Sequence, residues 1–419
     1  MKRLLVCLAA LLLLSGCVVS DPSLIIPTDP AQKRKTEAPT TPAPTLPVPL
    51  TTASTAPTGG WNYNTDCQTG LYSSQMMRAD VAESEDGLYY MVDRFLYFYD
   101  YASGLCVPLC SRPNCLHDKL TDSKQMALCG AYLEGDMNVS IFWQSGKLYA
   151  LTAQWVLGTK TYTTQLLEFS PDGTQRRTLY RFQGAAPVMG AEFCAHRGWL
   201  YLCESGYDEQ MNLQSDLVRV SLNGNTRETL YTCRRERLSE MENPGGGLIH
   251  LLAVGDNLYF LEMRGVQMVP MRLLLNTGAV VPLLENYPQL SSTTPLPLGD
   301  RLFLITTDVS ATCDPDGSNL TRCADIAPGY MVSNGAYLYV LDLSAFRYTD
   351  RDTLGLRIYD RDGALVQDLP LETQLPGGEA LYCTREALLV KTRTGRETHL
   401  YALSLAALLE GRVEPQQVY

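Results

Sequence analysis

Asp256-Asn257-Leu258-Tyr259-Phe260 decides the fold, because similar stretches occur at six other places in this 419-residue chain. Each copy has one or two turn-forming residues, followed by β-prone residues centred on a pair that is usually aliphatic and aromatic. Self-similarity at a regular spacing indicates a protein built from repeated units. The other copies are Gly87-Leu88-Tyr89-Tyr90, Gly146-Lys147-Leu148-Tyr149, Gly198-Trp199-Leu200-Tyr201, Asp300-Arg301-Leu302-Phe303, Ala336-Tyr337-Leu338-Tyr339-Val340 and Glu386-Ala387-Leu388-Leu389-Val390.

A second β-prone stretch follows most copies and ends in a tight turn. Asp172-Gly173, Asn223-Gly224 and Asp362-Gly363 occupy three of these turns. Asn-Gly and Asp-Gly supply the positive φ that two-residue hairpins need, so each unit is predicted to consist of antiparallel strands joined by short turns. The copy at Leu302 has the weakest partner, for which we expect a strand between Leu320 and Asp325.

A ring of stacked neighbours would let units of this kind bury both of their faces. The copies lie 36 to 60 residues apart, close to the roughly 40 to 50 residues of a four-stranded propeller blade. We therefore predict an all-β fold in which residues 61–419 form a β-propeller of seven blades. Six or eight blades, a β-sandwich pair and a barrel are the alternatives. One late helix is expected, from Ser404 to Leu409.

Residues 1–16 have the form of a bacterial export signal. A basic start precedes an apolar run from Leu4 to Leu14, which is shorter than the roughly 20 residues that span a bilayer. The run ends in a lipobox, Leu14-Ser15-Gly16-Cys17, so we predict cleavage before Cys17 and attachment of diacylglycerol to its sulfur. The alternative is an ordinary secretory signal that ends near Ser15 and leaves Cys17 as a free thiol.

Residues 17–60 are rich in Pro and Thr. Proline fixes φ and removes backbone donors, and few apolar side chains are present to form a core, so we predict a disordered, extended linker. Acyl chains on Cys17 would hold this linker at a membrane, since each buried methylene contributes about 0.8 kcal/mol. The predicted location is the cell membrane, with membrane lipid as one partner and the propeller on the extracytoplasmic side.

Cysteine supplies the next signal, because 11 of the 13 cysteines remain once Cys7 leaves with the signal peptide and Cys17 takes lipid. The densest group follows the first predicted hairpin and consists of Cys106, Cys110, Cys115, His117 and Cys129. A tetrahedral zinc shell of three sulfurs and one nitrogen could form from Cys110, Cys115, His117 and Cys129, although their spacing is not that of a standard zinc ribbon or finger. Exported domains also keep disulfides, and the sequence favours a disulfide-stapled loop over zinc, with free thiols as a third alternative.

A second cysteine pair flanks a predicted turn. Asp314-Pro315-Asp316-Gly317 has the composition of a hairpin turn. Cys313 and Cys323 lie on either side of it, and a disulfide between them would close the turn.

The loop Cys110-Ser111-Arg112-Pro113-Asn114-Cys115-Leu116-His117 contains the pattern Cys-x-x-Pro-x-Cys-x-His. Together with the lipobox, the polar linker and the strand repeats, it gives a chain that resembles a group of bacterial lipoproteins with a C-terminal β-propeller-like domain and such a loop. The resemblance covers nearly the whole chain. It implies location and fold only, because this group has no established activity to transfer.

The charge of the chain argues against nucleic acid as a partner. The sequence has 34 basic and 45 acidic residues, and removal of Lys2 and Arg3 with the leader leaves 32 basic residues. This excess of negative charge repels phosphate. The sequence also has no Gly-x-Ser-x-Gly elbow, phosphate-binding glycine loop or His-Glu-x-x-His motif, and we assign no catalytic residue.

We therefore predict that the propeller is a binding or scaffold module, tethered to the membrane, for a protein, peptide or glycan. One alternative is an extracytoplasmic propeller enzyme, a lyase or hydrolase that uses acidic residues of the rim loops as acid and base. Another is a component of an envelope complex, in which the cysteine loop acts as a metal or redox element.

Overall fold

The computed structural model describes residues 79–419 with short gaps, together with residues 62, 66, 68, 70, 72 and 73. The gaps are 120–121, 135–137, 157–160, 183–192, 208, 211, 225, 236–246, 265–266, 286, 288–293, 306–309, 324–328, 343–354, 372–374, 376–377 and 395–396. The predicted signal peptide (1–16), Cys17 and the predicted linker (17–60) lie outside the described residues.

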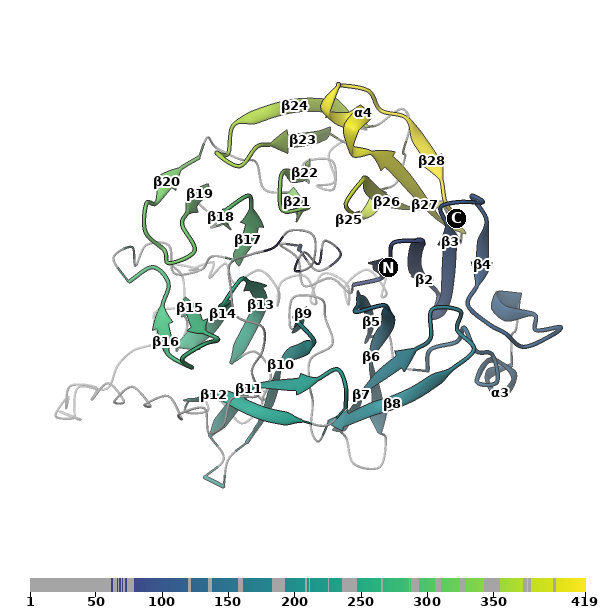
Figure 1. The fold of residues 1–419 in the computed structure, drawn as a ribbon, viewed down its shortest axis with the longest axis horizontal. Helices are drawn as coiled ribbons and strands as arrows, with labels where there is room; N and C mark the ends of the chain where they lie inside the picture. The colour runs from purple at the N-terminus through teal and green to yellow at the C-terminus, as the bar shows by residue number, and fades with distance from the viewer. Residues whose placement is uncertain are drawn as a thin grey trace, which may run out of the picture. The chain divides into compact units, whose positions relative to one another are not determined.

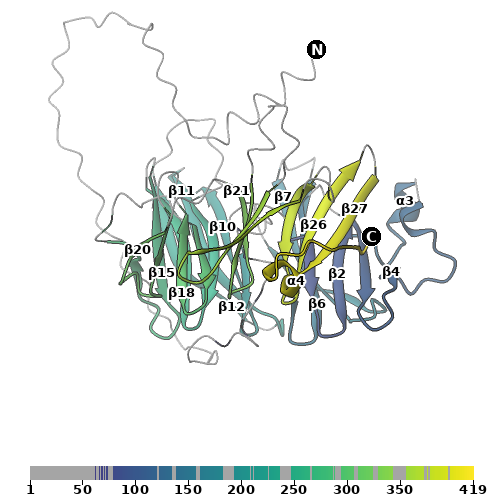
Figure 2. The same ribbon diagram turned by 90° about the horizontal axis from the view of Figure 1, so that it is seen from above.

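Seven antiparallel sheets of four strands each are arranged in a ring, as Figures 1 and 2 show. Consecutive strands of the chain form each sheet, from β1-β2-β3-β4 in blade 1 to β25-β26-β27-β28 in blade 7. The first strand of a blade lies toward the centre of the ring and the fourth lies at the rim (Figure 1). The predicted seven-bladed β-propeller is confirmed, and the alternatives of six or eight blades are excluded.

Blades 1 to 4 contain the first sixteen strands. Blade 1 is formed by β1 (Val81–Glu83), β2 (Gly87–Val92), β3 (Phe95–Asp100) and β4 (Cys106–Pro108). Blade 2 is formed by β5 (Asn138–Gln144), β6 (Lys147–Val156), β7 (Thr161–Phe169) and β8 (Arg176–Phe182). Blade 3 is formed by β9 (Phe193–His196), β10 (Trp199–Tyr207), β11 (Leu213–Ser221) and β12 (Arg227–Arg235). Blade 4 is formed by β13 (Leu248–Val254), β14 (Asn257–Arg264), β15 (Gln267–Leu274) and β16 (Val280–Pro282).

Blades 5 to 7 complete the ring. Blade 5 is formed by β17 (Thr294–Leu298), β18 (Arg301–Ile305), β19 (Ser310–Cys313) and β20 (Thr321–Arg322). Blade 6 is formed by β21 (Gly329–Ser333), β22 (Leu338–Asp342), β23 (Gly355–Tyr359) and β24 (Leu365–Pro370). Blade 7 is formed by β25 (Gly378–Cys383), β26 (Ala387–Thr394), β27 (Glu397–Ser404) and β28 (Pro415–Gln417). The short helical elements are η2 (His117–Lys119), α3 (Ser123–Met126) and α4 (Leu405–Leu409).

The pair of residues that repeats in the sequence occupies the second strand of every blade and joins it to both neighbours. Leu258 and Tyr259 in β14 point to opposite faces of their sheet, because neighbouring side chains alternate along a strand. Leu258 shares a buried cluster with Tyr201 of blade 3, whereas Tyr259 shares one with Leu302 of blade 5. The same arrangement joins the other blades through Tyr89 and Leu148, Tyr149 and Leu200, Phe303 and Leu338, Tyr339 and Leu388, and Leu389 and Leu88.

Two of these tyrosines also donate hydrogen bonds to the next blade. The Tyr89 hydroxyl donates to the carbonyl oxygen of Pro171 at 2.9 Å, and the Tyr259 hydroxyl donates to that of Pro315 at 2.7 Å. Both acceptors lie in the turn between the third and fourth strands of the following blade. Each tyrosine therefore links two blades through its buried ring and through its polar end.

Side chains from the two ends of the propeller close the ring between blades 7 and 1. The buried carboxylate of Asp80 accepts a hydrogen bond from the Tyr382 hydroxyl at 3.1 Å and lies 3.3 Å from Lys391 Nζ. The ring of Tyr419 packs against those of Tyr90 and Tyr97, with centroid distances of 5.7 and 4.9 Å. These contacts join residues more than 300 positions apart, so closure of the ring depends on the tertiary structure.

A glycine with positive φ occurs in the turn between the third and fourth strands of every blade. Gly317 shows why a larger residue does not fit: its φ is +85°, and a Cβ there would lie 1.9 Å from the carbonyl oxygen of Leu283 in blade 4. The turn of one blade therefore packs directly on the outer part of the preceding one. The seven glycines are Gly104, Gly173, Gly224, Gly278, Gly317, Gly363 and Gly411.

Two local predictions had different outcomes. The strand that pairs with β18 is β19, not a strand between Leu320 and Asp325 as the sequence predicted. Thr321 and Arg322 of that stretch form the short outer strand β20 instead. The expected late helix is confirmed as α4, whose N-cap Ser404 accepts a hydrogen bond from the Ala407 N–H. In the part of the chain that the structure describes, no helix is both long and apolar enough to cross a membrane.

The described residues before β1 pack on the ring at two places. The Asp66 carboxylate lies 2.8 Å from Arg197 Nη2, and Arg197 Nη1 lies 2.9 Å from Asp256. Tyr72 is buried in the cluster between blades 4, 5 and 6, and its carbonyl oxygen accepts a hydrogen bond from the Ser333 N–H at 3.0 Å. The described residues Asp66 and Tyr72 thus pack on blades 3 to 6.

Two glycine variants test the close approach at the blade turns. Gly317→Ala and Gly146→Ala both place a Cβ on a residue with positive φ, which costs about 1 to 2 kcal/mol. Gly146 has no atom within 4 Å of the added Cβ, whereas Gly317 meets Leu283. We expect Gly317→Ala to lower the free energy of unfolding by about 1 to 3 kcal/mol more than Gly146→Ala, as measured by urea unfolding. Equal losses would contradict the direct packing of this turn on blade 4.

Candidate functional site

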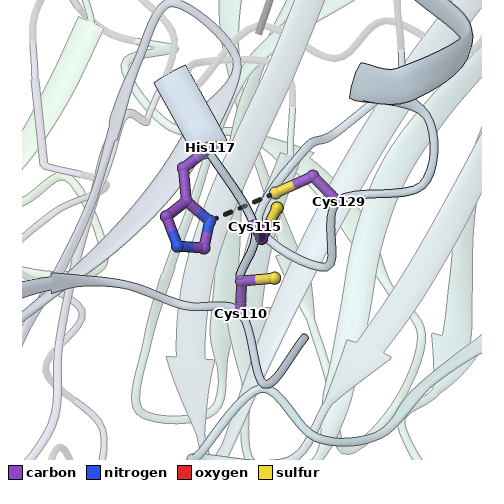
Figure 3. A group of neighbouring side chains, drawn as sticks. All are labelled: Cys110, Cys115, His117 and Cys129. Atoms are coloured by element: carbon purple, nitrogen blue, oxygen red, sulfur yellow. Dashed lines mark hydrogen bonds between the residues drawn. The ribbon is translucent and has the colours of Figure 1, made fainter. Parts of the chain in front are cut away.

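Four of the side chains that the sequence grouped together meet in the connection between β4 and β5. Figure 3 shows the three sulfurs and the imidazole gathered around one space. The four ligand atoms all lie within 4.8 Å of one another, and His117 Nδ1 lies 3.6 Å from Cys129 Sγ. We call these residues the Cys3His group; its members are Cys110, Cys115, His117 and Cys129.

The surroundings of the Cys3His group shift the pKa values of two of its thiols in opposite directions. The Gly130 N–H donates to Cys110 Sγ at 3.3 Å. Burial opposes ionisation of the Cys110 thiol, but backbone N–H groups, including those of Arg112 and Gly130, outweigh it and lower the pKa of Cys110. Burial raises the pKa of Cys129 to about 12, and the neighbouring sulfurs add to this shift. In the absence of a cation, negative charge on one sulfur opposes ionisation of the next.

Cys106 lies outside the Cys3His group. Its sulfur is 2.6 Å from the Tyr90 hydroxyl. Cys106 and the three cysteines of the group are all free thiols in the structure. The sequence favoured a disulfide-stapled loop, and in the structure three of its sulfurs and a histidine ring converge on one space.

Cys313 and Cys323, which were expected to form a disulfide, are free thiols in the structure. Thr312 is paired with Thr321 across β19 and β20, so Cys323 is three positions beyond the residue opposite Cys313. Three positions along a strand correspond to about 10 Å, and a disulfide needs Cα atoms within about 7 Å. Both side chains are buried in the cluster shared by blades 4, 5 and 6, where they act as small apolar residues.

A second candidate site is a cavity of about 620 Å³. It lies at the turns between the first and second strands of blades 1, 2 and 7, and Gln68 from the segment before β1 forms part of its wall. We call it the turn-face cavity. The charged and aromatic residues that line it are Glu83, Glu85, Tyr101, Trp143, Arg385 and Glu386.

Glu83 is the most enclosed carboxylate of the turn-face cavity. It accepts hydrogen bonds from the Tyr101 hydroxyl at 3.2 Å and from the Arg385 N–H at 2.8 Å. Burial is the main cause that raises the pKa of Glu83. Trp143 is held by the ring of Tyr89, which stacks on it at 5.4 Å. The wall therefore combines a fixed aromatic ring with a carboxylate anchored by contacts from blades 1 and 7.

The three remaining histidines lie outside both sites. His196 is 1% exposed, and its Nε2 lies 2.7 Å from the carbonyl oxygen of Gly255. His250 lies beside a bulge of β13, with a φ of +57°. His399 lies in β27, where its Nδ1 is 3.4 Å from the Gln417 amide nitrogen. The contacts of His196 and His399 indicate structural roles for these two residues.

The sequence did not reveal the turn-face cavity, because its residues come from positions 68 to 386. A signal was present in the repeat itself. Glu85, Ser145 and Arg385 occupy the turn just before, or at the start of, three copies of the repeated stretch. Equivalent turns of a propeller lie on one face of the ring, so these residues could have been grouped once the ring was assumed.

The comparisons with known proteins support the fold. No protein-family profile matches the sequence, and no curated protein matches it. Oligogalacturonate lyase from Vibrio parahaemolyticus has a TM-score of 0.50 and 10% identity over 82% of this chain and 92% of its own. An oligogalacturonate lyase in complex with manganese gives 0.50 and 10% over 87% and 98%, and an acylaminoacyl peptidase gives 0.50 and 10% over 86% and 54%. At this identity the similarity shows the β-propeller fold and nothing about activity.

A pH titration of stability tests the burial of His250. Burial lowers the pKa of His250 to about 4. The unfolded chain binds this proton near pH 6.5, so the contribution to stability is complete above about pH 6.5 and is lost as the pH falls toward 4. We expect the wild type to lose about 1 to 2 kcal/mol more than His250→Asn between pH 7 and pH 5 in urea unfolding. Asparagine tolerates positive φ, which makes it the suitable replacement.

His399→Asn is the matched control, because His399 lies in a regularly paired part of β27, whereas His250 lies at the bulge of β13. This variant is expected to keep the wild-type difference between the two pH values. An unchanged difference in His250→Asn would show that His250 is not shielded from protonation in the folded protein.

Proposed function

We propose that the chain is a membrane-anchored, extracytoplasmic lipoprotein whose propeller binds a ligand in the turn-face cavity. The observation that carries this proposal is the convergence of carboxylates and aromatic rings from three blades on one cavity. Its volume of about 620 Å³ is within the range of about 300 to 1,000 Å³ that is typical of ligand sites.

The chemistry of the wall favours a ligand with a cationic group. Glu85 and Glu386 are exposed carboxylates at the cavity, and Trp143 offers a ring on which a cation or an apolar face can pack. The negative charge of the whole chain adds long-range attraction for a cation. Basic side chains of a peptide and amino groups of a glycan both have this chemistry.

The location of the module rests on Cys17 and the Pro-rich linker. A lipid on Cys17 would fix the start of the linker at the membrane, and a Pro-rich chain extends by up to about 3.1 Å per residue. Such a spacer would leave the propeller in water, with its turn face accessible to ligands of the cell envelope.

Charge removal at the cavity tests the ligand class. We expect pentalysine and a glucosamine pentamer, used as two separate probes, to bind the wild type in isothermal titration calorimetry. Glu85→Gln combined with Glu386→Gln is expected to weaken binding of the preferred probe at least tenfold, equivalent to about 1.4 kcal/mol. Addition of salt is expected to weaken it as well, because the charges are exposed.

The control removes two charges elsewhere. Glu410→Gln combined with Glu414→Gln has the same effect on net charge, and both side chains are exposed and pair with Arg412. Binding that is equally weakened in both double variants would indicate a general charge effect and would contradict a site in the cavity. If neither probe binds the wild type, the proposed class of cationic ligands is rejected.

Replacement of Cys17 tests the anchor. In the wild type, we expect labelled palmitate to be incorporated and the protein to sediment with membranes unless detergent is added. Cys17→Ser is expected to lose both properties, because the hydroxyl is not the thiol that receives diacylglycerol. Cys106→Ser is the control and should behave as the wild type. Membrane association of Cys17→Ser would show that another part of the chain holds the protein there.

A further inference from the structure

We propose that the Cys3His group binds one Zn²⁺ ion, and that this ion takes the place of a hydrophobic core in the β4–β5 connection. The proposal is independent of the ligand that the turn-face cavity binds. It follows from the chemistry of the four side chains, from their geometry, and from the way the loop around them is built.

The donor set matches zinc. Thiolate and imidazole are its usual protein ligands, and a shell of three sulfurs and one nitrogen is a common structural type. With Zn–S near 2.3 Å and Zn–N near 2.0 Å, tetrahedral geometry places sulfur and nitrogen ligands about 3.5 Å apart. The observed distance between His117 Nδ1 and Cys129 Sγ is 3.6 Å. The spacing therefore already approaches that of a zinc site.

A disulfide explains less of the same geometry. It would join two of the three sulfurs and would leave the third sulfur and the imidazole of His117 without a role. All four ligand atoms instead lie within 4.8 Å of one another. The Gly130 N–H that donates to Cys110 Sγ is the kind of contact that orients a metal-bound thiolate.

The loop lacks the buried residues that would otherwise hold it together. Between positions 111 and 128, none of the side chains whose exposure the structure describes is buried, and α3 has no buried residue. Leu116 and Leu128 are 60% and 63% exposed. A segment that buries so little apolar surface needs another source of stability, and bound zinc supplies folding free energy directly.

The positions of the ligands suit this role. Cys110 and Cys129 stand at the start and the end of the loop, where the backbone is already tied to β3: the Leu109 N–H donates to the Leu96 carbonyl, and the Leu96 N–H donates to that of Ala131. Zinc would join these two fixed points to Cys115 and His117 in the middle of the loop.

The loop backbone also has positive φ at two positions other than glycine. Asn114 and His117 have φ values of +57° and +50°. Asparagine and histidine adopt the left-handed region more often than other non-glycine residues, but the conformation still has a cost, and it persists when surrounding interactions enforce it. Coordination by Cys115, which directly follows Asn114, and by His117 itself would provide that interaction.

Four protein ligands leave no open position for substrate or water. Zinc sites of this closed kind are structural, whereas catalytic sites keep one position free. The ion would therefore fix the shape of the loop at the edge of blade 1 and would take no part in chemistry at the turn-face cavity.

Metal analysis of the full chain, purified without added metal or chelator, tests the proposal. We expect one zinc ion per chain by mass spectrometry of the metal content. Cys115→Ser and His117→Ala are expected to lose most of it, whereas His117→Cys should retain it because a fourth thiolate can replace the imidazole. Cys106→Ser and His399→Ala are the matched controls and should each keep one zinc ion.

Limited proteolysis of the wild type gives a readout that does not depend on the folding of variants. Lys119 and Lys124 are exposed trypsin sites within the loop. A zinc chelator is expected to increase cleavage after both by at least tenfold while the propeller stays folded by circular dichroism, and added zinc should restore protection. Cleavage that does not respond to the chelator would show that zinc does not hold the loop.

Two results would overturn the proposal. One is a chain with less than a tenth of an equivalent of zinc even after reduction and incubation with zinc. The other is a disulfide between two of the three cysteines, found by alkylation and mass spectrometry in protein that retains a protected loop.

Discussion

This structure depends on one contact that recurs between neighbouring blades. A leucine in the second strand of each blade packs against a residue of the preceding blade, namely the residue that directly follows that blade's own leucine. A four-stranded antiparallel sheet with apolar residues on both faces needs a neighbour on each side. In the second strand of each blade, the leucine packs toward one neighbour and the next residue packs toward the other, as for Leu258 and Tyr259. Because every sheet has this requirement, the row of blades cannot end, and it is satisfied when Leu389 of blade 7 meets Leu88 of blade 1. Asp80, with Tyr382 and Lys391, adds polar contacts at the same closure.

Closure of the ring also creates the turn-face cavity. The β1–β2 turn and the β25–β26 turn are about 300 residues apart in the chain, yet the Arg385 N–H donates to the Glu83 carboxylate. The carboxylates and aromatic rings of the cavity are therefore a product of the seven-bladed geometry. The segment before β1 contributes as well, since Gln68 lines the cavity and the nearby Asp66 is fixed by Arg197.

The β4–β5 connection follows different physics from the ring that it interrupts. The blades are held by buried apolar area, whereas this loop exposes Leu116 and Leu128 and brings three sulfurs and one imidazole together. The proposed zinc ion would supply a local crosslink where the loop buries little apolar surface. The expected disulfide between Cys313 and Cys323 is absent from the structure for a geometric reason. Cys313 and Cys323 are offset by three positions across β19 and β20, and the loop cysteines converge on a common centre together with His117.

The sequence by itself determined the elements that are local. The repeated stretch around Leu258 and the Asp-Gly and Asn-Gly turns predicted the strand pairs, and their number predicted seven blades, because strand and turn preferences act over a few residues. It also grouped Cys110, Cys115, His117 and Cys129, since they lie within 20 positions of one another. The tertiary structure decided what depends on distant contacts: the strand that pairs with β18, the separation of Cys313 from Cys323, the exclusion of Cys106 from the Cys3His group, and the cavity. These are matters of register and of three-dimensional distance, which local preference does not specify and which become fixed only when the ring closes.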